Sequence, residues 1–200
     1  MGISVAILAG GRSSRMGFDK ALALLDGQPL IERVLARVAD LGSEVMLIAN
    51  SPELYTYLGL PIYPDVIPNR RTLGGIYTAL VHAANEHSLV VACDLPFLNR
   101  ALMAHLITLR EGCDVVVPMN REGFPEGAQA VYGKGCLEPI RRQLERSDLK
   151  VTEFYSDVCV RQVGDAEIDR FDPHRCSFFN VNMPGDLTAA GKMIAKGTCT

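Results

Sequence analysis

Near its start the chain reads VAILAGGRSSRMGFDK over residues 5–20. An apolar, β-branched run stops at two glycines, and a loop with two arginines and a lysine leads into a helical pattern. Glycine lets a backbone approach an anion closely because it has no Cβ, and consecutive backbone N–H groups can line an anion site. Arg12, Arg15 and Lys20 add positive charge that suits a polyphosphate. The stretch therefore predicts a strand that leads into a phosphate-binding loop.

Strand-like and helix-like segments alternate along most of the chain. Strands are expected at Ile3–Ala9, Glu44–Ala49, Pro61–Pro64, Ser88–Cys93, Asp114–Pro118, Ala128–Gly133, Val158–Val163 and Phe178–Asn182. Helices are expected at Pro29–Leu41, Gly75–Asn85, Arg100–Arg110, Cys136–Arg146 and Pro184–Ala195, with a short turn or helix at Tyr55–Leu58. This alternation indicates an α/β fold with a mostly parallel sheet and helices on both faces. No linker, repeat or low-complexity stretch interrupts the pattern, so residues 1–200 are predicted to form a single domain.

Composition and charge argue against several classes of protein. The net charge of −3 argues against a protein that coats nucleic acid, because such proteins usually carry a basic excess. The sequence shows neither an apolar run long enough to span a membrane nor a basic, apolar leader, so we expect a cytoplasmic protein. The six cysteines include no Cys-x-x-Cys pair, and several lie in apolar surroundings. They are therefore predicted to be reduced, mostly buried thiols.

Several polar residues follow expected strands directly. Gly10-Gly11, Asn50, Asp94 and the segment Asn180-Val181-Asn182 all fall at or just past strand ends. In mostly parallel sheets, ligands bind outside the carboxyl ends of the strands. These residues, separate in sequence, are therefore expected to converge on one crevice.

Asp94 and Lys20 are the strongest candidates for chemistry. A carboxylate that closes a buried strand is costly unless it is paired or binds a cation, and Mg²⁺ is usually held by one or two carboxylates together with phosphate oxygens. Lys20, with Arg15, suits electrostatic stabilisation of a transferring phosphoryl group, which needs no protein nucleophile. The alternatives are a helix N-cap for Asp94 and a solvated surface lysine for Lys20.

Weaker candidates lie beside the expected crevice. The amide of Asn50 could form hydrogen bonds with a base edge or a ribose. The alternative for both Asn50 and Asp65 is an ordinary turn residue with no ligand. Gly74, just before an expected helix, offers a second anion or base platform. Asn180 and Asn182 would point the same way from a strand, which suggests polar recognition of a second substrate, completion of a metal shell, or anchoring of a loop.

The first loop resembles Leu-Ala-Gly-Gly-x-x-x-Arg-Met-Gly-x-Asp-Lys, the signature of nucleotidyltransferases related to molybdenum cofactor guanylyltransferase. It has neither the Gly-Lys-Ser/Thr ending of a P-loop nor the Gly-x-Gly-x-x-Gly spacing. The similarity extends over nearly the whole chain, through residues 26–31, 49–50, 92–97, 114–118 and 179–184. The Phe-Asn-Val-Asn-x-Pro ending separates this family from the sugar-nucleotide and cytidylyl relatives that share the first loop.

The resemblance implies a Rossmann-like, three-layer α/β/α fold. It implies an enzyme that joins GMP from GTP to the terminal phosphate of molybdenum-loaded molybdopterin, with Mg²⁺, and releases pyrophosphate. It assigns catalysis to Arg15, Lys20 and Asp94, the metal to Asp94, and acceptor binding to Asn180 and Asn182. Nucleotide contacts are implied at Leu8, Ala9, Gly10, Gly11, Lys20, Asn50, Asp65, Gly74 and Asp94. Transient contacts with molybdopterin-delivering proteins and apo-molybdoenzymes would follow, with no nucleic-acid or membrane partner.

Two segments depart from the family pattern. Relatives usually read Gly-Pro-Leu-Ala/Gly-Gly where this chain reads Arg71-Thr72-Leu73-Gly74-Gly75, and they carry Pro-Leu where this chain has Gly127-Ala128. The first segment bears on the choice of base and the second on the acceptor. The alternatives are therefore a CTP-dependent molybdopterin cytidylyltransferase, a sugar- or alcohol-phosphate nucleotidyltransferase, and a nucleotide-binding carrier that delivers cofactor without catalysis.

Overall fold

A seven-stranded sheet in the order β5-β4-β1-β6-β8-β7-β9 forms the centre of the computed structural model, which describes residues 2–9 and 19–199. The strands are β1 (Ser4–Leu8), β4 (Glu44–Ile48), β5 (Ile62–Tyr63), β6 (His87–Ala92), β7 (Val115–Pro118), β8 (Gln129–Gly133) and β9 (Val160–Val163). Only β8 runs antiparallel to its neighbours, β6 and β7. The expectation of a mostly parallel sheet is confirmed, and the carboxyl ends of β1, β6 and β7 share one edge.

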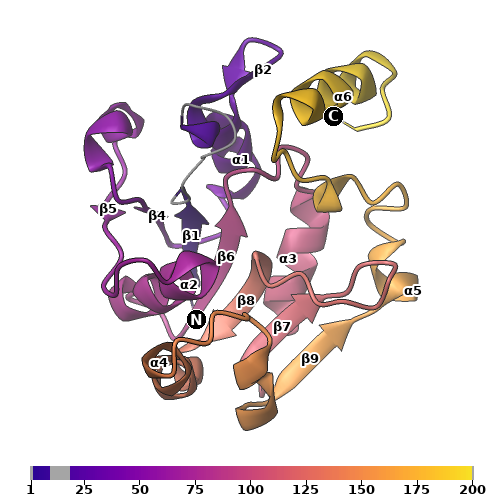
Figure 1. Cartoon of the computed structure of the whole chain (residues 1–200). Helices are drawn as coiled ribbons and strands as arrows, with labels where there is room; N and C mark the ends of the chain where they lie inside the picture. The colour runs from indigo at the N-terminus through magenta and orange to yellow at the C-terminus, as the bar shows by residue number, and fades with distance from the viewer. Residues whose placement is uncertain (1, 10–18, 200) are drawn as a thin grey trace.

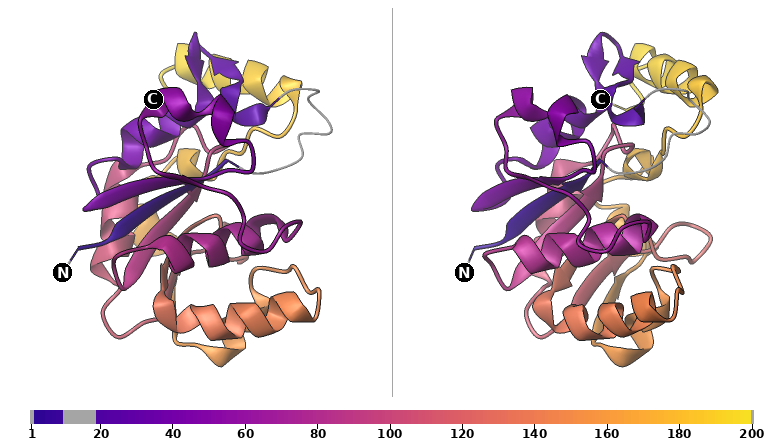
Figure 2. Two further views of the ribbon diagram at one scale, coloured as in Figure 1. Left: turned by 90° about the vertical axis from the view of Figure 1, so that its left-hand side faces the viewer. Right: turned by 60° about the vertical axis from the view of Figure 1, so that its left-hand side comes forward.

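Helices cover both faces of the sheet, as Figures 1 and 2 show. They are α1 (Leu30–Val38), α2 (Arg71–His82), α3 (Arg100–Thr108), α4 (Leu137–Glu145), α5 (Asp165–Ile168) and α6 (Pro184–Ala195). Short 3-10 turns are η1 (Lys20–Leu22), η2 (Pro52–Leu54), η3 (Thr56–Leu58), η4 (Lys134–Cys136), η5 (Glu153–Asp157) and η6 (Cys176–Phe178). The α1 and α3 helices pack on one face, and α2 and α4 on the other. Because both faces are covered, every residue of β1 is buried.

A small third core lies above the sheet edge, where α6 packs on the hairpin of β2 (Leu24–Leu25) and β3 (Gln28–Pro29). Asp26 and Gly27 turn this hairpin with φ of 52° and 76°. Two consecutive positive φ angles are typical of the tight turns that match the twist of a hairpin, and Asp-Gly is a favoured pair for them. The sequence pattern had not indicated this hairpin.

Some boundaries differ from those expected. The α2 helix begins at Arg71 rather than Gly75, and the short α5 had not been expected. The strand expected at Phe178–Asn182 is wrong, because Phe178 ends a 3-10 turn and the chain continues as an irregular extended segment. Within the described residues, no helix is long and apolar enough to cross a membrane.

Two of the six cysteines form a disulfide, so the expectation that all were reduced thiols is wrong. Cys176 and Cys199 are bonded, with Cα atoms 5.7 Å apart and a sequence separation of 23 positions. Both are buried in the core formed by α6 and the β2–β3 hairpin. The bond therefore fastens the end of the described chain to η6. The other four cysteines are free.

We expect the variant Cys199→Ser to be about 3 kcal/mol less stable than the native chain, because the disulfide closes a loop of intermediate length in the unfolded state. Urea denaturation with and without reductant would measure this loss, and reduction should remove the difference between the two proteins. Thiol titration in denaturant should count four thiols in the unreduced native chain. A count of six would contradict the bond.

Candidate functional site

The side chains of Lys20, Asp94 and Asn182 meet at the carboxyl edge of the sheet. Lys20 begins η1, Asp94 lies two residues beyond β6, and Asn182 lies just before α6. Lys20 Nζ donates to Asp94 Oδ2 and, at 3.1 Å, to Asn182 Oδ1. The Lys20 and Asp94 side chains are only 20% and 14% exposed. Three residues expected from the sequence to share a crevice are thus in direct contact.

The second carboxylate oxygen of Asp94 has the properties of a ligand for a cation. Asp94 Oδ1 is buried and has no hydrogen-bond partner among the described residues. A buried acceptor without a partner is costly, and an oxygen-preferring ion such as Mg²⁺ would satisfy it. No cluster of three or more His, Cys, Asp or Glu side chains in the described part of the chain could hold a metal ion. An ion at Asp94 would therefore draw its other ligands from substrate phosphates and water, as Mg²⁺ commonly does.

Lys20 is held in place by a buried tyrosine that sequence reasoning did not single out. Asp19 caps η1, where its Oδ1 accepts from the backbone N–H of Ala21 at 3.0 Å. The Tyr55 hydroxyl donates to Asp19 Oδ2 at 2.6 Å and lies 3.5 Å from the carbonyl oxygen of Ala9. Tyr55 is fully buried. Its phenol thus joins the end of the first strand to the residue before Lys20.

The charge state of Tyr55 suits this role. Burial, with the Asp19 carboxylate beside it, raises the pKa of the Tyr55 phenol far above its usual range. The hydroxyl therefore remains a hydrogen-bond donor at every pH at which the protein would work.

Asn50 and Asp65, both expected to contact a nucleotide, lie together beyond β4 and β5. Asn50 Nδ2 donates to Asp65 Oδ2 at 2.8 Å, and the Asp65 backbone N–H donates to Asn50 Oδ1 at 2.9 Å. This reciprocal pair holds an amide and a carboxylate at the sheet edge that carries Asp94. Leu8 and Ala9 lie at the end of β1 between the two groups, and both are buried.

Gly74 does not begin a helix, so the expected anion platform at a helix N-terminus is wrong. It lies in the first turns of α2, and its N–H already donates to the Arg70 carbonyl at 3.0 Å. Its contact with a nucleotide stays a prediction. The strained position is Arg71, whose φ is 51°. The family pattern has glycine there, and glycine adopts positive φ without steric cost.

The segment from Phe179 to Asn182 keeps the alternation that suggested a strand. Val181 is fully buried, and Asn180 and Asn182 on either side are exposed. The Val181 N–H donates to the carbonyl oxygen of Asp94 at 2.9 Å, which fastens the segment beside the ion pair. Asn182 therefore reaches Lys20, whereas the Asn180 side chain forms no hydrogen bond with another described residue.

The glycine at position 127, where the family pattern has proline, lies in a confined space. A Cβ on Gly127 would lie 2.5 Å from Val151 Cγ1 and 3.0 Å from the Tyr132 hydroxyl. The side chains of Val151 and Tyr132 thus fill the space that a larger residue at position 127 would need. Gly10, Gly11, Arg12 and Arg15 lie outside the described residues, and their roles stay predictions.

Comparisons with known proteins agree with this geometry. Residues 5–158 match the family model of the MobA-like NTP transferase domain. The probable molybdenum cofactor guanylyltransferase of Natranaerobius thermophilus is 34% identical over 97% of each chain. The molybdenum cofactor guanylyltransferase of Desulfosudis oleivorans is 35% identical over 96% of this chain and 95% of its own. The crystal structure of molybdopterin-guanine dinucleotide biosynthesis protein A from Archaeoglobus fulgidus superposes with a TM-score of 0.84 and 26% identity, over 97% of this chain and all of its own.

We expect Tyr55→Phe to lower the free energy of unfolding by about 2 kcal/mol, because it removes a buried hydrogen bond to a carboxylate. The phenol's pKa is raised on folding, so its stabilisation is complete below about pH 10 and is lost as the pH rises further. The variant should therefore lose less stability above pH 10 than the native chain, by about 1.4 kcal/mol per pH unit. Urea titrations at several pH values would measure both effects.

Tyr57→Phe is the matched control, because Tyr57 is 57% exposed and is two residues away. It should change stability by less than about 0.5 kcal/mol. Equal effects of the two substitutions would contradict the role assigned to Tyr55.

Proposed function

This chain belongs to the family of MobA-like NTP transferases, and from that membership we propose that it is a molybdenum cofactor guanylyltransferase. It transfers GMP from GTP to the phosphate of molybdenum-loaded molybdopterin and releases pyrophosphate. The observation that carries the proposal is the contact of Lys20 with Asp94 and Asn182 at the carboxyl edge of the sheet. Residues 1–200 act as one nucleotidyltransferase domain in this proposal.

In the proposed reaction a phosphate oxygen of the acceptor attacks the α-phosphorus of GTP in line. A new oxygen–phosphorus bond forms, and the bond from the α-phosphorus to the bridging oxygen breaks, so its electron pair leaves with pyrophosphate. Lys20 would neutralise charge that grows on the α-phosphate, and Arg15 is assigned to the β- and γ-phosphates. Catalysis is therefore electrostatic and positional, and no side chain becomes covalently attached.

Asp94 orients Lys20 through one carboxylate oxygen and offers the other to a divalent cation. Mg²⁺ would supply Lewis-acid stabilisation of the phosphate charge when bound there. Asn182 accepts from Lys20 and, with Asn180, would contact the acceptor. The Asn50–Asp65 pair would contact the nucleoside, because a carboxylate and an amide can accept from and donate to the edge of a base. Transient delivery of product to an apo-molybdoenzyme belongs to the same proposal.

The variants Asp94→Asn and Lys20→Ala should each lower kcat at least 100-fold, because Lys20→Ala removes a cation assigned to the reacting phosphates and Asp94→Asn removes the carboxylate that orients Lys20 and would hold the metal. Pyrophosphate release from GTP in the presence of acceptor would measure kcat, and circular dichroism would check folding. Asp40→Asn is the control, since Asp40 is an exposed acid paired with Arg100 and should leave kcat unchanged. A folded Asp94→Asn protein with native turnover would refute the role of Asp94.

Product identity tests the reaction itself. The protein is incubated with Mg²⁺, molybdenum-loaded molybdopterin and either GTP or CTP, and the dinucleotide is identified by chromatography. We expect a guanine dinucleotide from GTP alone. A cytosine product would assign a cytidylyltransferase, and nucleotide binding without pyrophosphate release would indicate a carrier.

A further inference from the structure

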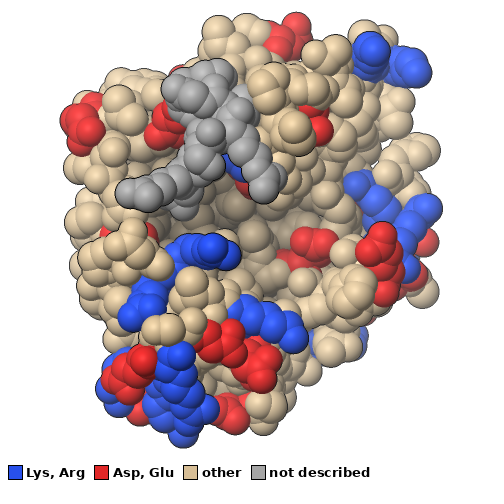
Figure 3. Space-filling view, viewed as in Figure 1, with Lys and Arg blue, Asp and Glu red and all other residues tan. Residues whose placement is uncertain are grey.

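A second hollow lies along the same edge of the sheet, beyond β7 and β8. It is a cavity of about 270 Å³ lined by Asn120, Arg121, Glu122, Glu126, Arg175 and Phe178. Four of these residues belong to the hairpin that links β7 to β8, and two belong to the region around η6. Figure 3 shows this face hollowed near its centre, with acidic and basic side chains around the rim. The volume suits one flat bicyclic ring rather than a whole nucleotide.

Asn120 gives the hairpin a fixed shape. Its Oδ1 accepts from the backbone N–H groups of Glu122 and Phe124, at 3.0 and 2.9 Å. Its Nδ2 donates to Glu126 Oε1 at 2.9 Å. The Glu126 backbone N–H in turn donates to the carbonyl oxygen of Pro118 at the end of β7. Glu126 therefore presents a half-buried carboxylate to the cavity in a fixed orientation.

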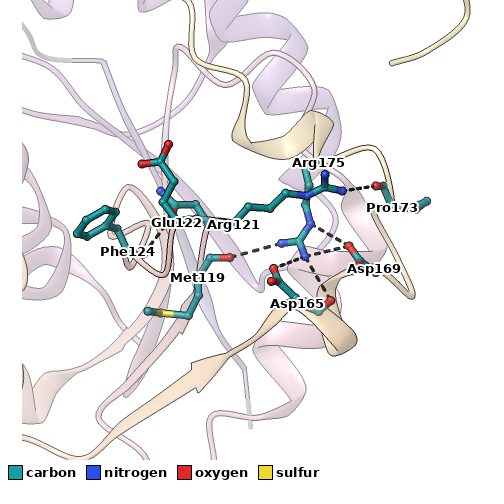
Figure 4. A network of polar contacts seen from close by, with 9 residues as sticks. Met119, Arg121, Glu122, Phe124, Asp165, Asp169, Pro173 and Arg175 are labelled. Atoms are coloured by element: carbon teal, nitrogen blue, oxygen red, sulfur yellow. Dashed lines mark hydrogen bonds and ion pairs between the residues drawn. The ribbon is translucent and has the colours of Figure 1, made fainter.

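The two arginines of the cavity are engaged with other groups. The Arg175 guanidinium binds Asp165, Asp169 and the carbonyl oxygen of Met119, as Figure 4 shows. Arg121 donates to the carbonyl oxygen of Pro173 at 3.3 Å. No ion pair of Glu126 is recorded among residues 2–9 and 19–199. Its carboxylate, oriented by a neutral amide, retains lone pairs for a ligand that donates hydrogen bonds.

One short segment of chain runs from the cavity to the ion pair. Phe178 lines the cavity, Val181 binds the carbonyl oxygen of Asp94, and Asn182 contacts Lys20. An extended segment from residue 178 to residue 182 spans about 13 Å. On the hairpin side, the Ala128 carbonyl accepts from the Ala92 N–H at 2.8 Å, two residues before Asp94. A ligand with a flat ring at one end and a phosphate at the other could therefore occupy both places.

We propose that this cavity binds the pterin ring of the acceptor, with Glu126 as the residue that recognises it; the inference rests on the proposed guanylyltransferase function. A pterin carries an amino group and a ring N–H side by side on one edge, which matches the two oxygens of a carboxylate. The face of Phe178 forms apolar lining, held by Arg175 at 5.5 Å from the ring centre. The acceptor phosphate then points along the segment that ends at Asn182, toward Lys20.

The test is equilibrium binding of molybdopterin to the full chain, followed by pterin fluorescence. Glu126→Gln replaces one acceptor oxygen with an amide N–H₂ of the same shape, which would face the donors of the pterin edge. We expect this variant to bind molybdopterin at least 10-fold more weakly and to bind GTP with native affinity. Glu111→Gln is the matched control, because it makes the same charge change at an exposed position that does not line the cavity. It should bind both ligands as the native chain does.

Native molybdopterin affinity in Glu126→Gln would overturn the proposal, and so would an equal loss in both variants, which would indicate a general effect of charge. A native chain that binds no molybdopterin would also overturn it. Failure of the parent function is distinct: the native chain would then bind molybdopterin through Glu126 but form no guanine dinucleotide. A chain that forms the dinucleotide, with unchanged acceptor KM in Glu126→Gln, would overturn the pterin subsite alone.

Discussion

The ion pair between Lys20 and Asp94 is the interaction on which the site depends. Both side chains are largely shielded from water, so neither charge would be stable there alone, and removal of one would leave the other uncompensated. The pair also decides which atom can receive a ligand. Because Lys20 occupies Oδ2 of Asp94, the buried Oδ1 is the oxygen left for a cation. One contact therefore positions the ammonium group and leaves a single carboxylate oxygen, the one proposed to face a divalent cation.

The layered fold could be predicted because its strands are continuous apolar runs that must be covered on both faces. The hairpin at Asp26-Gly27 could have been recognised from that pair of turn residues, although its strands are too short to show periodicity. The strand expected at Phe178–Asn182 failed for a different reason. Alternating burial is present there, but the segment lies beyond the end of β6, where it meets Asp94 rather than a neighbouring strand. Alternating burial of side chains does not by itself show that a neighbouring strand is available for backbone hydrogen bonds.

Residues at strand ends could be brought together from sequence, since parallel strands deliver their carboxyl ends to one edge. This reasoning placed Asp94 and Asn182 with Lys20, and Asn50 near the same edge. It could not find Tyr55, because the hydrogen bond to Asp19 joins residues 36 positions apart and depends on how η3 folds back over the sheet edge. The bond between Cys176 and Cys199 could not be predicted either. It requires Cα atoms close together in space, here 5.7 Å apart, and the spacing of cysteines along the sequence does not give that distance.

The C-terminal region fixes the segment that carries the two asparagines for which we propose contact with the acceptor. The disulfide of Cys176 fixes the start of the segment that carries Asn180 and Asn182, and α6 fixes its end, where Asp186 Oδ2 accepts from the Asn182 N–H at 2.8 Å. Val181 is buried between these two anchors. A segment held at both ends and in the middle loses little freedom when a ligand binds, so more of the contact energy contributes to affinity. The side-chain amides of Asn180 and Asn182 thus belong to a part of the chain that packing against α6 keeps rigid.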